Sequence, residues 1–178
     1  MVLHAIFGEM IVIEWYVLRT VCGKEDAALT MLRKMFPEVE LIYPKRRISW
    51  RKQGEVIGLV RPLFDGYLFI SCPKEKIRGF DQLLRMRKLN IAWLVYSGEA
   101  LVPILNEEKQ LIQRLMGSDG IVEVSTVVKH NEQLQILSGP LVGLEHIVKK
   151  VSHRNRRITV EISMLDEKRK IELEGLLI

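Results

Sequence analysis

The chain has 178 residues, of which 48% are hydrophobic and 28% are charged. That length suits one large domain or two small ones, and the composition supplies both a core and a polar surface. The net charge of +5 and the sequence pI of about 9.3 mildly favour an anionic partner. No apolar run is long enough to cross a bilayer, and the first residues lack a signal-peptide pattern, so we expect a cytoplasmic protein without membrane contact.

Cysteine and histidine usage argues against metal and cofactor chemistry. Cys22 and Cys72 lie 50 positions apart, no CxxC occurs, and the four histidines show no ligand spacing, so we expect reduced thiols and no metal or cofactor. No serine or cysteine nucleophile has a histidine and a carboxylate at a recognisable spacing, and no phosphate-binding glycine loop is present. We therefore expect no enzyme activity, although a triad assembled from distant residues stays open.

The first elements are predicted from residue type and spacing. Residues 12–20 carry β-branched and aromatic side chains on both faces, which predicts a strand covered on both sides. An amphipathic helix is expected between Gly23 and Pro37. Its apolar stripe consists of Ala28, Leu32, Met35 and Phe36. Further on, Gln53-Gly54 is expected to form the tip of a hairpin that joins residues 45–52 to 55–61.

Four further elements are predicted before the chain changes character. An apolar strand is expected over residues 67–72, a basic helix over 74–88 and another strand over 91–96. A second amphipathic helix is expected to begin at Asn106, a favourable N-cap residue that two glutamates follow.

The clearest break in composition is Gly117-Ser118-Asp119-Gly120, and it predicts a linker over residues 117–125. Only strand signals with Gly/Pro turns follow, which suggests a small barrel over residues 126–178. These strands are expected at residues 127–129, 133–137, 146–151, 158–162 and 171–173. Residues 1–116 would form a mixed α/β domain. Met10 is a second candidate start, which would make residues 1–9 a mobile extension.

Three segments resemble the NusG family of two-domain transcription factors. In chain order they are residues 15–20 (WYVLRT), 62–70 (PLFDGYLFI) and 139–145 (GPLVGLE), the last being similar to the KOW motif. The resemblance covers nearly the whole chain from Trp15 onward. It implies an α+β fold: an N-terminal domain with an antiparallel sheet flanked by helices, then a small KOW-type β-barrel. It also implies a monomeric, non-enzymatic factor that associates with RNA polymerase in elongation or processive antitermination.

The resemblance places polymerase docking in an apolar depression of the first domain, which binds the clamp helices of the β′ subunit. Phe64 matches the aromatic of the family's Phe-Pro-Gly-Tyr-type turn, with Asp65 in place of proline, so Phe64 is the expected anchor. Tyr67 and Phe69 follow on the next strand. Ordinary core packing is the alternative for all three aromatics; it is favoured for Tyr67 and Phe69, whereas polymerase binding is favoured for Phe64 at the turn itself.

Several departures from the housekeeping pattern are visible. The family's Ser-Ile-Phe-Gly loop, which contacts a ribosomal protein or Rho, is SMLD here at residues 163–166, so it lacks the aromatic and the φ-permissive glycine. A Thr-Pro-Gly-Val turn is replaced by RMRKLN at residues 85–90. The chain therefore most resembles specialised paralogs of the LoaP and RfaH type. The alternatives are a housekeeping factor that couples polymerase to the ribosome or Rho, and a ribosome-associated KOW RNA-binding protein.

Basic clusters occupy residues 45–52, 74–88 and 149–157. The last packs five permanent cations into nine residues, and we expect it to bind a hairpin in nascent RNA. Its binding residues would be Lys149, Lys150, His153, Arg154, Asn155, Arg156 and Arg157. Family docking places the first domain beside upstream DNA, where further cations could contact phosphates. These are Arg33, Lys34, Lys45, Arg46 and Arg47, for which a merely solvated face is the alternative.

Overall fold

The computed structural model describes residues 11–87, 90–130 and 133–178. The extension expected at residues 1–9 lies outside these ranges. None of the helices within them is long and apolar enough to span a membrane.

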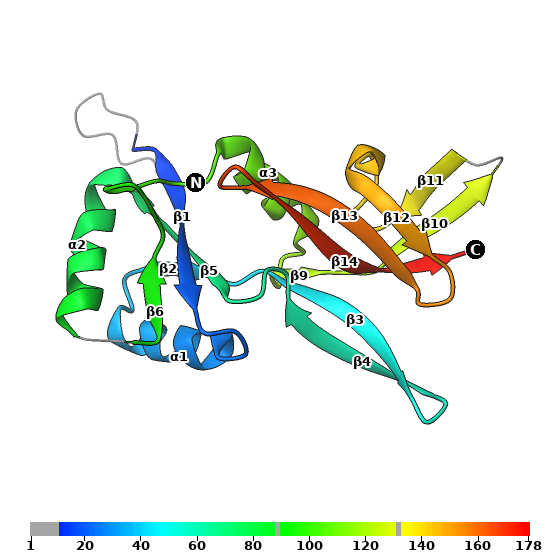
Figure 1. Cartoon of the computed structure of the whole chain (residues 1–178), viewed down its shortest axis with the longest axis horizontal. Coiled ribbons are helices and arrows are strands. Elements are labelled where there is room, and N and C mark those ends of the chain that lie inside the picture. The colour runs from blue at the N-terminus through cyan, green and yellow to red at the C-terminus, as the bar shows by residue number, and fades with distance from the viewer. Residues whose placement is uncertain (1–10, 88–89, 131–132) are drawn as a thin grey trace.

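The first half of the chain is built on a four-stranded antiparallel sheet, which we call the first sheet, with strand order β2-β5-β1-β6. Its strands are β1 (Ile13–Thr20), β2 (Glu40–Ile42), β5 (Tyr67–Pro73) and β6 (Ala92–Leu94). Helices α1 (Glu25–Met35) and α2 (Lys74–Met86) pack on one face of it, on the side away from the C-terminal half (Figure 1). As the sequence pattern predicted, β1 is buried on both faces over most of its length.

Strands β3 (Lys45–Lys52) and β4 (Glu55–Pro62) form a long hairpin that projects from the first sheet (Figure 1). Its tip is Gln53-Gly54, as predicted, and both residues adopt positive φ angles of 53° and 88°. Such a turn matches the twist of the two strands. The short strand β9 (Ile121–Val122) runs parallel to the start of β3, so the segment expected to be a linker contains a strand.

The C-terminal half forms a five-stranded sheet, which we call the second sheet, with order β11-β10-β14-β13-β12. Its pairs are antiparallel except for β10 with β14. The strands are β10 (Ser125–His130), β11 (Gln133–Ser138), β12 (Val148–Ser152), β13 (Arg157–Met164) and β14 (Glu167–Leu177). All five predicted strands are present. The third begins two residues later than predicted, because residues Glu145–Ile147 form a 3-10 turn (η1).

The segment between the two halves contains β7 (Tyr96–Ser97), β8 (Ala100–Leu101) and helix α3 (Asn106–Leu115). The expected N-cap role of Asn106 is wrong, because the helix already includes that residue. The Glu108 carboxylate instead accepts a 2.9 Å hydrogen bond from the backbone N–H of Leu105 and so satisfies the helix start.

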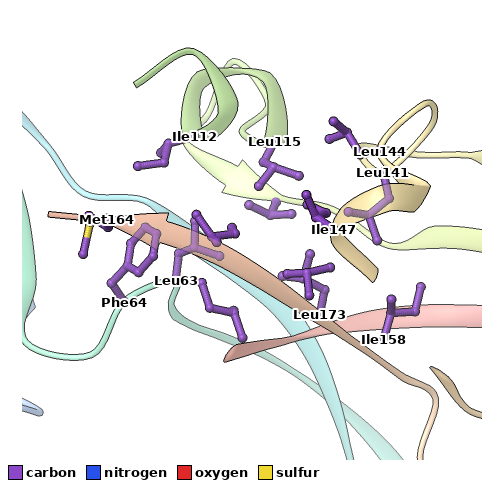
Figure 2. Close-up of a cluster of buried hydrophobic side chains, with 14 of the residues drawn as sticks. Leu63, Phe64, Ile112, Leu115, Leu141, Leu144, Ile147, Ile158, Met164 and Leu173 are labelled. Carbon is purple, nitrogen blue, oxygen red and sulfur yellow. The ribbon is translucent and has the colours of Figure 1, made fainter. Parts of the chain in front are cut away.

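Two hydrophobic clusters hold the fold together. One lies between the first sheet and helices α1 and α2. The other, which we call the shared core, joins the opposite face of the first sheet and α3 to the second sheet. Figure 2 shows Leu63 and Phe64 in the shared core, beneath side chains of α3 and beside those of β13 and β14. The two halves of the chain therefore share one continuous hydrophobic interior.

Candidate functional site

The turn that carries Phe64 is fixed by its backbone. Gly66 has a φ of 76°, and a Cβ there would lie 3.0 Å from the Cys22 sulfur, so a glycine is required. The Gly66 N–H donates a 2.8 Å hydrogen bond to the buried Glu25 carboxylate at the start of α1. The Tyr67 N–H donates to the Phe64 carbonyl at 3.2 Å. The start of α1 therefore fixes the turn through Glu25, and Phe64 packs into the shared core on the opposite face of the sheet.

Phe64 is only 5% exposed. Its ring packs edge-on against Phe69, with centroids 6.1 Å apart, and Phe69 in turn packs on Trp15 at 5.5 Å. The turn motif suggested an exposed anchor, and the structure differs: the second sheet covers this aromatic group, with Met164 of β13 fully buried in the same cluster (Figure 2). Phe69 is fully buried as well, and Tyr67 is nearly so.

A polar contact joins the two sheets beside these aromatics. Arg169 of β14 donates a 2.9 Å hydrogen bond to the Tyr67 hydroxyl, and its guanidinium lies 4.7 Å from the Tyr67 ring centroid. Arg19 of β1 lies over the same ring at 5.5 Å. Tyr67 is therefore held by cations from both halves of the chain. Arg169, which no sequence pattern singled out, is the residue that connects the second sheet to it.

The β3–β4 hairpin is also bound to the second sheet. Arg46 donates a 2.6 Å hydrogen bond to the Glu172 carbonyl, and burial lowers the pKa of its guanidinium. Ser49 donates from its hydroxyl to the buried Glu174 carboxylate and accepts from Arg157 at its carbonyl. The first part of β3 is therefore joined to β13 and β14 by polar contacts at Arg46 and Ser49.

The five cations expected to face DNA separate into two groups. Lys45 pairs with Asp26 at 2.6 Å, Arg46 binds the second sheet, and Arg47 forms a two-pronged ion pair with Glu123 at 2.8–3.0 Å. The Glu123 hydrogen bonds and charge raise the pKa of Arg47. These three cations are therefore engaged by other groups of the same chain. Arg33 and Lys34, in the last turn of α1, are exposed as a phosphate contact requires.

The basic cluster at residues 149–157 does not present all its charges to solvent. Arg157 donates to the carbonyls of Asn155 and Arg156 and to the hairpin, and it is half-buried. Lys149 pairs with Glu161 at 3.6 Å, and the Arg156 Nε lies 3.8 Å from Glu174. The remaining members of the cluster are exposed, namely Lys150, His153, Arg154 and Asn155. Residues 153–156 form the turn between β12 and β13, which we call the basic turn.

The basic turn faces the hairpin across a groove of about 570 Å³. Trp50 of β3 lines this groove and is 62% exposed. The sequence already placed this tryptophan among basic residues, but that pattern alone did not indicate that it faces the basic turn. Within the described residues, no group of three or more histidine, cysteine or acidic side chains could hold a metal ion.

The structure thus joins an α/β unit, through its aromatic face, to a small all-β unit that carries a basic turn. A family model described as "Transcription termination factor nusG" matches residues 13–116. That segment is more than half of the chain, so the chain belongs to the NusG family, whose members are non-enzymatic transcription factors.

The sequences of known relatives align with this chain along almost their full length. The transcription termination/antitermination protein NusG of Thermus thermophilus is 23% identical over 176 residues, which is 91% of this chain and 95% of that protein. The protein of the same name from Halalkalibacterium halodurans is 23% identical over 171 residues, which is 90% of this chain and 94% of that one. A solved structure titled "Domain interaction in Thermotoga maritima NusG" matches with a TM-score of 0.54 and 18% identity, covering 92% of this chain and 94% of that one. This last similarity supports the fold.

Proposed function

We propose that this chain is an RNA polymerase-associated factor for elongation and processive antitermination, of the specialised LoaP/RfaH type. Residues 1–116 dock on the β′ clamp helices, and residues 126–178 form a KOW-type barrel that binds nascent RNA, with residues 117–125 between them. The observation that carries this proposal is the aromatic group of Phe64, Tyr67 and Phe69 on the face of the first sheet opposite helices α1 and α2, where the second sheet covers it. Buried aromatic anchors of this kind dominate protein interfaces.

The same aromatic group packs against the second sheet, so docking requires the second sheet to move away. Polymerase and the second sheet would then compete for one surface. We call the packing of the second sheet on the first closure, and its free energy reduces the affinity for polymerase. Closure therefore acts as a threshold. Such a threshold suits a factor that acts only on selected operons.

The loop at residues 163–166 gives further support for a specialised factor. Met164 is fully buried in the shared core, and Leu165 packs against it. The matching loop of housekeeping NusG family members is the one that contacts the ribosome or Rho. Because its apolar side chains are used for closure here, and its aromatic is missing, we propose RNA as the second partner instead.

Arg33 and Lys34 are the residues we propose to face upstream DNA, because both are exposed at one end of α1. Lys45, Arg46 and Arg47 would contribute there only if their present partners were released.

Polymerase binding tests the proposal in two steps. Arg169→Met removes the contact to Tyr67 and should strengthen polymerase binding by roughly 5- to 30-fold, if about 1–2 kcal/mol of closure free energy is lost. Adding Phe64→Ala in that background should weaken binding by about 2 kcal/mol or more. Trp93→Ala, which removes a half-exposed aromatic of β6, is the matched control. Equal polymerase binding by the Arg169→Met protein with and without Phe64→Ala, both folded, would contradict the proposal.

A further inference from the structure

The groove between the hairpin and the basic turn combines two kinds of lining. Its hairpin wall is largely apolar, and the rest of its lining is mainly cationic, with one acidic residue, Glu172. The hairpin contributes Ile48, Trp50 and Val56 to the groove, and the basic turn contributes Arg154, Asn155 and Arg156. With a volume of about 570 Å³, the groove falls in the size range of small-ligand sites in proteins.

Trp50 offers an uncovered aromatic face in this groove. It is 62% exposed, and its cross-strand partner Ile57 and the neighbouring Val56 are 41% and 50% exposed. A tryptophan in the middle of a paired strand would ordinarily be covered by its own fold, since it carries a large apolar area. An indole face in reach of arginines suits a planar, electron-rich, anionic ligand. A nucleotide base attached to its phosphate has these properties.

The arginines on the opposite wall differ in what they can do. Arg157 is bound to three carbonyl oxygens and so fixes the wall. Arg154 is exposed and forms no ion pair or hydrogen bond with the described residues. Arg156 adopts a φ of 54°, which is uncommon for a residue with a Cβ. Its buried Nε lacks a hydrogen-bond partner within the described part of the chain. It lies 3.8 Å from the Glu174 carboxylate, so Arg154 is the cation available to an anion in the groove.

We propose that the groove binds one unpaired nucleotide, with its base stacked on Trp50 and its phosphate held by Arg154. The Asn155 amide lies on the same wall and can hydrogen-bond to a base edge. This inference rests on the proposed RNA-binding role of the basic turn and deepens it. A fully paired duplex keeps its base faces stacked on each other, so the target must contain a loop or bulge nucleotide.

The groove also has a consequence for closure, because its two walls come from opposite halves of the chain. A ligand that contacts both walls binds only where they face each other, so it stabilises the closed arrangement. RNA with an unpaired base in the groove would then oppose separation of the second sheet from the first.

The test compares an RNA hairpin that carries a single bulged nucleotide with a fully paired RNA of the same length. A DNA oligonucleotide with the same bulge is the third ligand. Affinities of the full-length protein are measured by fluorescence anisotropy across a salt series. The variants are Trp50→Leu and Arg154→Ala, and their matched controls are Trp93→Leu on β6 and Arg78→Ala on α2, both exposed and remote from the groove in sequence.

We expect the parent to prefer the bulged ligands and Trp50→Leu to lose that preference, with a roughly 5- to 150-fold drop in affinity for bulged RNA. Arg154→Ala should reduce the slope of log affinity against log salt by about one. The controls should match the parent. Preference for bulged RNA over bulged DNA would identify the transcript as the source of the nucleotide, and equal binding would place the shared chemistry in base and phosphate.

Equal affinity of the parent for bulged and paired RNA, or an unchanged affinity in the folded Trp50→Leu protein, overturns the inference. In both cases RNA binding by the basic turn, and so the proposed function, still stands. A parent that binds no RNA removes the inference and the RNA role together. Polymerase binding, measured on the same variants, reports separately on the first domain and should not respond to Trp50→Leu.

Discussion

Changing Tyr67 to phenylalanine removes one hydroxyl and leaves the ring between Arg19 and Arg169. The lost contact is the 2.9 Å hydrogen bond from the Arg169 guanidinium. A hydrogen bond to a charged group contributes about 1.5–3 kcal/mol. The Arg169 side chain is 26% exposed, which lowers that figure, and the cation–ring contact at 4.7 Å is retained. We therefore expect Tyr67→Phe to reduce the free energy of unfolding by about 1–2 kcal/mol.

A double-mutant cycle isolates this contact. Arg169→Met removes the guanidinium while keeping much of the side-chain length, and the Tyr67→Phe/Arg169→Met protein completes the cycle. The coupling energy should be about 1–2 kcal/mol, since Tyr67→Phe can cost little once the donor is gone. For a chain of this size, each kcal/mol corresponds to about 2–4 °C in Tm. Urea unfolding of the full chain, compared at equal m-values, supplies the free energies.

The control cycle pairs Tyr67→Phe with Arg78→Met, an exposed arginine of α2. Its two effects should add to within about 0.5 kcal/mol. A coupling between Tyr67 and Arg169 no larger than that of the control pair would show that the contact contributes nothing to closure. The packing of the second sheet on the first would then lack stabilisation by the Arg169–Tyr67 hydrogen bond.

Two further substitution and labelling experiments probe the local structure. Gly139→Ala should destabilise the protein by more than about 1 kcal/mol, because the residue has a φ of 94° and the new Cβ would lie 2.5 Å from the Val124 carbonyl oxygen. Gly79→Ala in α2 meets no atom within 4 Å and should instead stabilise by about 0.5–1 kcal/mol, so equal urea midpoints for the two variants would contradict this account. Burial raises the pKa of the Cys72 thiol, so its thiolate fraction at pH 8 is reduced and iodoacetamide should alkylate the exposed Cys22 first. The rate at Cys72 should increase as the pH is raised, and peptide mapping that finds equal rates at pH 8 would refute the assignment.

Local features of the fold could be predicted because neighbouring residues determine them. Trp15 and Tyr16 point to opposite faces of β1, and both are buried, as the doubly apolar pattern indicated. Gln53-Gly54 forms the hairpin tip because a tight turn there needs two positive φ angles. The wrong cap at Asn106 shows the limit of such rules, since the helix already includes Asn106 and Glu108 accepts the hydrogen bond from the Leu105 N–H before it.

The candidate site could be predicted only in part, because its contacts join residues far apart in the chain. The pattern around Phe64 showed an aromatic at a turn, but its cover comes from a strand about a hundred residues later. Charge alone likewise did not separate Arg154, which is exposed, from Arg157, which binds the hairpin 108 residues away. Partners of this kind depend on how the two sheets meet, and no local periodicity encodes that.

If the second sheet separates from the first as proposed, strand β9 limits how far it can travel. Ile121 and Val122 pair with β3, and β10 starts at Ser125, so only two residues connect the halves while β9 stays in place. A fully extended pair of residues spans about 7 Å. Such a short tether keeps the effective concentration of one half near the other very high, so the halves would rejoin rapidly whenever the polymerase dissociates. A larger separation requires β9 to detach from β3 and the Arg47–Glu123 ion pair to break. The pairing of this short strand therefore sets the length of the connection between the two sheets.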